Sequence, residues 1–117
     1  MLKSENKGKY IKASDCPIAA TIDVIGGKWK PIIIWLLIQD VKRFGELHRS
    51  IPGIALKVLN RQLKELEADG IITRTAYPEV PPRVEYALSE KGKTLTDIMK
   101  SLALWSTTNI LEPEKAD

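Results

Sequence analysis

Basic and amide side chains gather on one predicted helix between positions 54 and 70, IALKVLNRQLKELEADG. A helix turns by about one hundred degrees per residue, so every third or fourth side chain shares a face. The two faces carry Leu56, Leu59, Leu63 and Leu66 on one side and Lys57, Arg61 and Lys64 on the other. Between positions 42 and 64 there are six lysines and arginines and one glutamate. A helix of this kind suits either a polyanion or plain solvent.

The only cysteine, Cys16, occupies a second place where chemistry is feasible. The run Ser14-Asp15-Cys16-Pro17 predicts a helix start, with Ser14 or Asp15 as the cap and Pro17 in the first turn. A helix dipole favours the thiolate of a cysteine near its first turn, so Cys16 is a candidate for oxidation. The alternative is a small buried hydrophobic residue. A lone cysteine excludes an internal disulfide and a cysteine-based zinc site.

Other catalytic patterns do not stand out in the sequence. His48 is the only histidine, and the absence of a second ligand nearby favours a surface or phosphate-contacting role over metal binding. A thiol catalyst would need a base beside Cys16, but His48 lies on a different predicted element. There is no pair of acid–base carboxylates and no glycine-rich phosphate loop. We therefore expect no enzyme activity, no cofactor and no metal.

Composition and length predict a single globular domain. The chain has 117 residues, 44% hydrophobic and 28% charged, with a net charge of +3 and a pI near 9.0. Its longest apolar run, 32–38, is far shorter than the ~20 residues of a membrane span. The N-terminus has no hydrophobic signal region. These features predict a cytoplasmic protein that does not enter a membrane.

The first half of the chain predicts an arm and three helices. Residues 1–14 read as a flexible basic arm, followed by a helix to about Ile25 that Gly26 and Gly27 end. The next helix, opened by 28–31, is apolar nearly all round and belongs at the centre of the core. The lysines at its start either contact a nearby phosphate or are solvated. After a turn at 39–42, a short helix over 43–50 turns Phe44, Leu47 and Ile51 inward.

The break at 51–53 completes a helix-turn-helix pattern with the helix that begins near residue 54. Two strands, 71–77 and 83–88, then flank a proline-rich tip and predict a wing. At its rim, Arg83 is placed to reach a phosphate or the minor groove, or to pair with Glu79 or Glu85. Ser89 caps a last helix to about Asn109. Its apolar stripe packs either on a second copy or on its own core.

These elements predict one winged-helix domain over 15–110 and a frayed tail over 111–117. The fold class is mainly α with a small β-wing (α+β), a winged helix-turn-helix.

Several short motifs of the chain resemble HxlR-type winged-helix transcriptional regulators, which are related to the MarR group. They are Cys16-Pro17, Ile25-Gly26-Gly27-Lys28-Trp29-Lys30, Arg43-Phe44 with Glu46-Leu47, Ile51-Pro52-Gly53-Ile54, Leu63 with Leu66-Glu67, and YPEVPPRVEY at 77–86. The resemblance implies a DNA-binding regulator dimerising through terminal helices, and it puts Cys16 where several members sense oxidants or electrophiles. One departure is Ala55, where the family often has Ser or Thr; this removes an N-cap worth ~1 kcal/mol.

Together, the residues and the resemblance predict a homodimeric regulator that binds double-stranded DNA at an inverted-repeat operator. Arg61 is the candidate for guanine readout and Asn60 for adenine. The expected phosphate contacts are Lys28, Arg43, Lys57, Lys64 and Arg83. An oxidant or electrophile acting on Cys16, near the predicted dimer interface, would change the spacing of the two recognition helices. The alternative is a winged-helix protein-interaction module without specific DNA binding.

Overall fold

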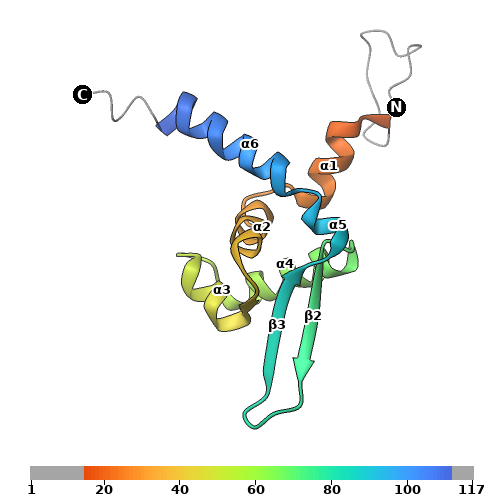
Figure 1. Ribbon diagram of the computed structural model, residues 1–117, viewed down its shortest axis with the longest axis vertical. Helices are drawn as coiled ribbons and strands as arrows, with labels where there is room; N and C mark the ends of the chain where they lie inside the picture. Colours follow the sequence, from red (N-terminus) through yellow and green to blue (C-terminus); the bar gives the residue numbers. More distant parts are fainter. Residues whose placement is uncertain (1–14, 112–117) are drawn as a thin grey trace.

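The computed structural model describes residues 15–111 of the chain (Figure 1). The elements are α1 (Pro17–Ile25), α2 (Lys30–Gln39), β1 (Lys42–Arg43), α3 (Phe44–Ser50), α4 (Leu56–Ala68), β2 (Ile72–Tyr77), β3 (Arg83–Leu88), α5 (Glu90–Lys93), α6 (Thr96–Ser106) and a π-helical turn, η3 (Thr107–Leu111). The predicted basic arm over 1–14, and all of the predicted tail over 111–117 except Leu111, lie outside the described residues. The prediction of a mainly helical protein with a small β-wing is confirmed.

Helix α2 runs through the centre of the core, as its apolar sequence predicts. Ile33, Ile34 and Leu37 are buried, and they belong to one cluster with the buried leucines of α3 and α4. Trp29 and Trp35 are partly buried and pack against that cluster. The core therefore sits between α2, α4 and the sheet.

The wing is a hairpin of β2 and β3 that extends away from the body (Figure 1). A third strand, β1, pairs with β3 on the other side, so the sheet order is β1-β3-β2. The sequence predicted only a turn at 39–42 and missed β1. Two residues are too few to show an alternating pattern, and the strand is defined only by its pairing with β3, of Lys42 with Tyr86 and of Arg43 with Glu85.

The last helix is broken, although the sequence predicted one continuous helix over 90–109. At Thr94 and Leu95 the backbone N–H groups donate three residues back, to Lys91 and Gly92, which tightens the chain and separates α5 from α6. Gly92 lies so close to the carbonyl of Ile71 that a Cβ there would be 2.1 Å from its oxygen. Helix α5 is thus pressed onto the start of the wing, and α6 leaves in its own direction.

Helix α1 begins and ends close to the predicted positions, but its cap is different. The N-cap is Cys16, whose Sγ accepts a hydrogen bond from the Ala19 N–H at 3.5 Å, rather than Ser14 or Asp15. Pro17 occupies the first turn and Gly26 ends the helix. Because the sulfur satisfies an N–H group of the first turn, Cys16 is part of the helix end and not a residue beside it.

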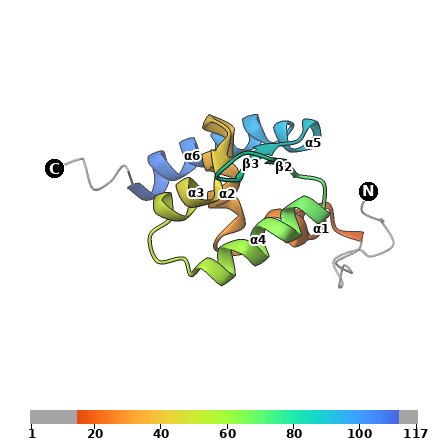
Figure 2. The ribbon, with the colours of Figure 1, turned by 90° about the horizontal axis from the view of Figure 1, so that it is seen from below.

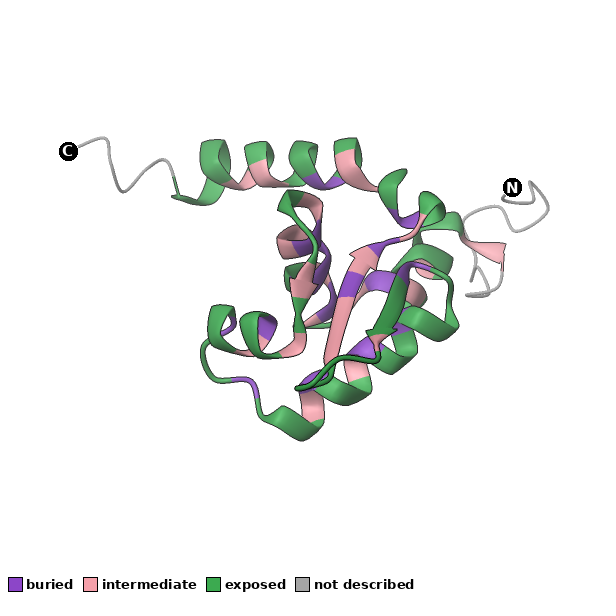
Figure 3. Cartoon of the chain, turned by 60° about the horizontal axis from the view of Figure 1, so that its bottom comes forward, coloured by how far each residue is buried: buried purple, intermediate pink, exposed green. Residues whose placement is uncertain are grey.

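Helices α1 and α6 lie at the end of the molecule opposite the wing tip, and both are largely exposed (Figures 1 and 3). Their exposed large apolar side chains are Ile18 and Ile22 on α1 and Ile98, Leu102, Leu104 and Trp105 on α6. Within the described residues, no helix is both long and apolar enough to cross a membrane.

Candidate nucleic-acid interface

Helix α4 is fixed to the core along one face and at its C-terminal end. Leu59, Leu63 and Leu66 are fully buried or nearly so. At its C-terminus Gly70 adopts a left-handed φ of 77°, and the N–H of Ile71 donates to the Leu66 carbonyl at 2.9 Å. This is a Schellman ending, as the glycine predicted. The helix is therefore a rigid support for the side chains on its other face.

The outward face of α4 carries the basic groups that the sequence placed there. Lys57, Arg61 and Lys64 are exposed, and so is Asn60. Helix α4 lies on the opposite side of α2 from α6 (Figure 2). The basic face and the exposed apolar helix thus occupy different sides of the molecule.

A polar pocket of about 340 Å³ lies between α4 and the wing strands. Its walls are Asn60, Lys64 and Glu67 from the helix, with Arg74 and Tyr86 from the strands. Sequence reasoning missed Arg74, an exposed residue of β2 that brings a further cation to the same surface. The alternation of β2 was the available signal, because it places Arg74 on the same face as the buried Ile72, the face that meets α4.

The start of α4 differs from the prediction at one residue. Leu56 was expected on the buried leucine face, but it is 57% exposed. Leu56 lies about 60° from Leu59 around the helix, at the edge of the stripe, and the buried Ile54 fills the core at this end. Ala55 is the N-cap and makes no side-chain cap hydrogen bond, as predicted. The first turn thus presents an apolar side chain beside the basic ones.

Lys30 connects the start of α2 to α4 through an ion pair that the sequence did not predict. It is 9% exposed, and its Nζ lies 2.7 Å from Oε1 of Glu65 on α4. The Lys30 ammonium lowers the pKa of Glu65 by hydrogen bonding and by its charge, and Arg61 adds a smaller effect in the same direction. Lys30 is neither solvated nor at the surface, so of the two lysines at the start of α2 only Lys28 is exposed.

Lys28 and Arg43 lie away from α4 in the sequence and reach the surface from other elements. The Lys28 ammonium stacks over the Trp29 ring, 4.7 Å from its centroid. Arg43 ends β1 and caps α3, where its backbone N–H donates to Oε1 of Glu46 at 2.7 Å. Both side chains are exposed.

Arg83 is engaged within the wing. Its guanidinium pairs with Glu79 at 3.1 Å and with Glu85 at 3.4 Å, and it stacks on the Tyr77 ring at 4.0 Å. Both carboxylates expected as its alternative partners are present, but they come from its own strand and the loop before it. The residue across the ladder is Tyr77. Arg83 therefore stiffens the base of the wing tip in this state.

His48 is half-buried and has a structural contact instead of a free ring. Its Nε2 lies 3.1 Å from the carbonyl oxygen of Ile54, to which it donates a hydrogen bond. This bond ties α3 to the residue that precedes the α4 cap. The sequence predicted a surface or phosphate-contacting role for His48, and the structure gives it a hydrogen bond within the chain.

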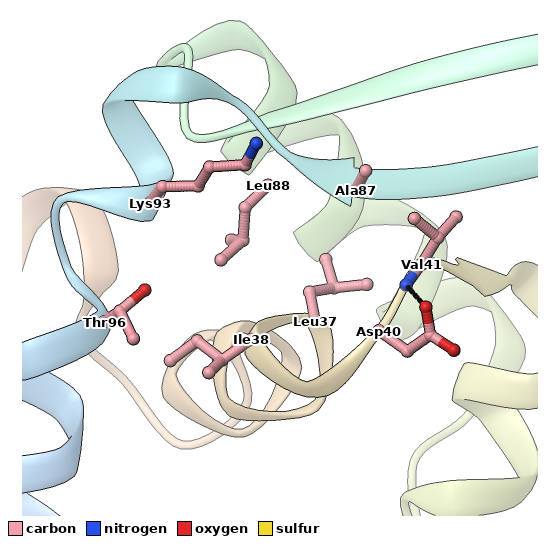
Figure 4. A pocket seen from close by; sticks show the side chains of 8 residues that line it. All are labelled: Leu37, Ile38, Asp40, Val41, Ala87, Leu88, Lys93 and Thr96. Atoms are coloured by element: carbon pink, nitrogen blue, oxygen red, sulfur yellow. Dashed lines mark hydrogen bonds between the residues drawn. The ribbon is translucent and has the colours of Figure 1, made fainter.

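A further pocket, of about 430 Å³, opens between the end of α2, strand β3 and the start of α6 (Figure 4). Its floor is apolar, with Leu37, Ile38 and Leu88. Its charged groups are already partnered: Asp40 accepts from the Val41 N–H at 2.7 Å, and Lys93 pairs with Glu90 at 3.2 Å. No residue predicted to contact DNA lines this pocket.

A helix-turn-helix made of α3 and α4, followed by a β-hairpin wing, defines a winged-helix protein. The sequence matches the family model of the HxlR-like helix-turn-helix over residues 24–114, and the chain belongs to this family. It is a transcriptional regulator of the helix-turn-helix class. The predicted family is confirmed.

Several relatives support this assignment. The chain is 49% identical to the HTH-type transcriptional regulator BH0655 of Halalkalibacterium halodurans over 110 residues, which cover 93% of this chain and 97% of the relative. The structure is similar to the redox regulator HypR in its oxidized form (TM-score 0.77, 49% identity, 80% of this chain and 97% of HypR). It is also similar to the reduced transcriptional regulator YodB of Bacillus subtilis (TM-score 0.71, 35% identity, 81% and 94%). These relatives are regulators, which favours a regulator over an enzyme.

Proposed function

We propose that this protein is a homodimer that binds a specific inverted-repeat DNA operator through α4. The observation that carries the proposal is the exposed face of α4, where Lys57, Asn60, Arg61 and Lys64 project from a helix whose leucines are fixed in the core. A rigid helix with such a face fits the major groove, which admits an α-helix.

Each side chain of this face has a role that follows from its chemistry. Arg61 reads guanine by bidentate hydrogen bonds, and Asn60 reads adenine in the same way. Lys57 and Lys64 contact phosphates and set the position of the helix, with Lys28 and Arg43 doing so from other elements. Arg83 reaches a phosphate only by leaving Glu79 or Glu85, so its contribution to affinity is the smallest of the set.

The second copy packs on the terminal helices. An open apolar groove of about 430 Å³ lies between α2 and α6, lined by Ile32, Trp35 and Leu102 among others. Together with the exposed side chains of α1 and α6 it forms an apolar surface that a monomer would leave in water. Covering it with a second copy gives a two-fold axis. The operator is then an inverted repeat, with half-site centres separated by whole helical turns of about 34 Å.

Cys16 is proposed as the site of regulation by oxidants or electrophiles. It is partly exposed and caps α1, whose Ile18 and Ile22 belong to the proposed dimer surface. HypR, a redox regulator, is among the similar structures. In the presence of diamide, two thiols lose two protons and two electrons, which reduce diamide to its hydrazine, and a disulfide forms. The second thiol is either Cys16 of the other copy or a small thiol.

Selection of bound duplexes from a random pool, with reduced protein at about 0.15 M salt, tests the DNA proposal. Enrichment of one inverted repeat supports it. An active dimer that enriches no sequence contradicts it and favours the protein-interaction module. On the selected operator, diamide is expected to change the affinity of the wild type and not of Cys16→Ser. An unchanged diamide response in Cys16→Ser would contradict the sensing role alone.

A further inference from the structure

Leu56 is an exposed leucine on the first turn of the helix proposed to enter the major groove. It is 57% exposed, whereas Leu59, three residues further on, is fully buried. Lys57 follows Leu56 and Asn60 lies one turn further on, both exposed, and more than half of Leu56 stays outside the core. In a major groove, this side chain would be matched by an apolar group on a base edge.

The position of Leu56 is fixed from both sides. Two residues before it, Ile54 is buried and its carbonyl accepts the His48 hydrogen bond at 3.1 Å. The N–H of Leu59 donates to the Ala55 carbonyl at 2.9 Å, so the first helical turn is closed. Leu56 also lies one turn ahead of Asn60 on the same side of the helix. The backbone at Leu56 is thus held in a defined place relative to Asn60.

We propose that Leu56 contacts the 5-methyl group of a thymine and selects thymine at one position in each half-site. This rests on the proposed function of α4. The thymine methyl is the only apolar group that base edges present in the major groove. The purines present polar acceptors and donors in the groove, and cytosine carries only a hydrogen at the same carbon, so neither gives the leucine a methyl group to contact. Because Leu56 and Asn60 are one turn apart, the thymine lies within about two base pairs of the adenine that Asn60 reads.

Deoxyuridine lacks only the 5-methyl group, so it isolates the contact. In the operator obtained by selection, each thymine is replaced by deoxyuridine, one symmetric pair of positions at a time. We expect one position at which the wild type loses about fourfold in affinity per half-site, the value of one buried methyl group. Leu56→Ala should bind the unmodified operator more weakly and show little further loss at that position.

Leu56→Met keeps an apolar side chain of similar reach and should retain the sensitivity to deoxyuridine, which separates methyl contact from a general disturbance of the helix. A selected operator with no sensitive thymine overturns the role of Leu56 and leaves the proposed function intact. Equal sensitivity in the wild type and in Leu56→Ala does the same. Failure to enrich any operator overturns both proposals.

Discussion

Helices α4 and α6 have the same kind of sequence, but the apolar stripe of α4 is mostly buried and that of α6 is mostly exposed. Both carry large apolar side chains at three- and four-residue spacing. In α4 the stripe is buried within the chain, with Leu63 only 1% exposed. In α6 Met99 is buried, but Leu102 and Trp105 are more than half exposed. An apolar stripe therefore shows that a helix packs on something, and it does not show whether the partner is the same chain.

The largest expected effect is on stability, and it distinguishes the buried stripe of α4 from the exposed stripe of α6. Leu63→Ala removes a fully enclosed side chain and should lower the free energy of unfolding by about 2–5 kcal/mol. Leu102→Ala should change the stability of the monomer by less than about 0.5 kcal/mol. Chemical denaturation at several protein concentrations measures both. The Leu102 effect should grow at concentrations where dimers form, and equal, concentration-independent losses would mean that α6 is a core helix.

A charge on the exposed stripe should break the proposed dimer without unfolding the chain. Trp105→Glu places a carboxylate in the apolar surface, and its expected cost is at least ~2 kcal/mol, or about thirtyfold in the dimerisation constant. Sedimentation equilibrium gives the constant, and circular dichroism checks the fold. Lys100→Glu, at an exposed position of α6 about 140° around the helix from Trp105, is the control for an added carboxylate and should dimerise normally. An unchanged constant in Trp105→Glu would contradict α6 as the interface.

Substitutions on the outer face of α4 should affect DNA and leave the dimer unchanged. Arg61→Ala is expected to lose about 1–3 kcal/mol of discrimination at one base pair of each half-site. Lys57→Ala should weaken binding to all sequences and reduce the slope of log affinity against log salt by about one. Titrations of selected and scrambled duplexes at several salt concentrations separate the two. If Arg61→Ala weakened both duplexes equally, Arg61 would be a phosphate contact.

The smallest effect concerns the attachment of α4 to α2 through Lys30 and Glu65. The folded state holds the pKa of Glu65 below its ordinary value, so it binds fewer protons there than the unfolded chain does. The stabilisation is present near neutral pH and is lost as the pH falls through the folded pKa.

Glu65→Gln should therefore lower the melting temperature slightly at pH 7, and the difference from the wild type should shrink as the pH falls below the ordinary glutamate pKa of 4.5. Glu67→Gln, an exposed carboxylate two residues further along α4, controls for the general loss of charge. A difference that stays constant with pH would show that the ion pair does not stabilise the fold.

Residue types with a local mechanism were predictable from the sequence. Gly70 ends α4 because its left-handed φ suits glycine, and Pro17 begins α1 because a first-turn proline lacks only an N–H that has no partner there. The basic face of α4 follows from spacing, and family motifs indicated the winged helix-turn-helix. These features depend on residues only a few positions apart in the chain, so the sequence alone is enough to predict them.

Contacts between distant residues were decided only by the tertiary structure. The pair Lys30–Glu65 spans two helices, and no local pattern shows that a lysine at a helix start will be buried. Strand β1 exists only because β3 pairs with it, and Leu56 is exposed although its spacing groups it with the buried leucines of α4. Spacing along the chain fixes which side chains share a face. Which face meets another element depends on how the whole chain packs.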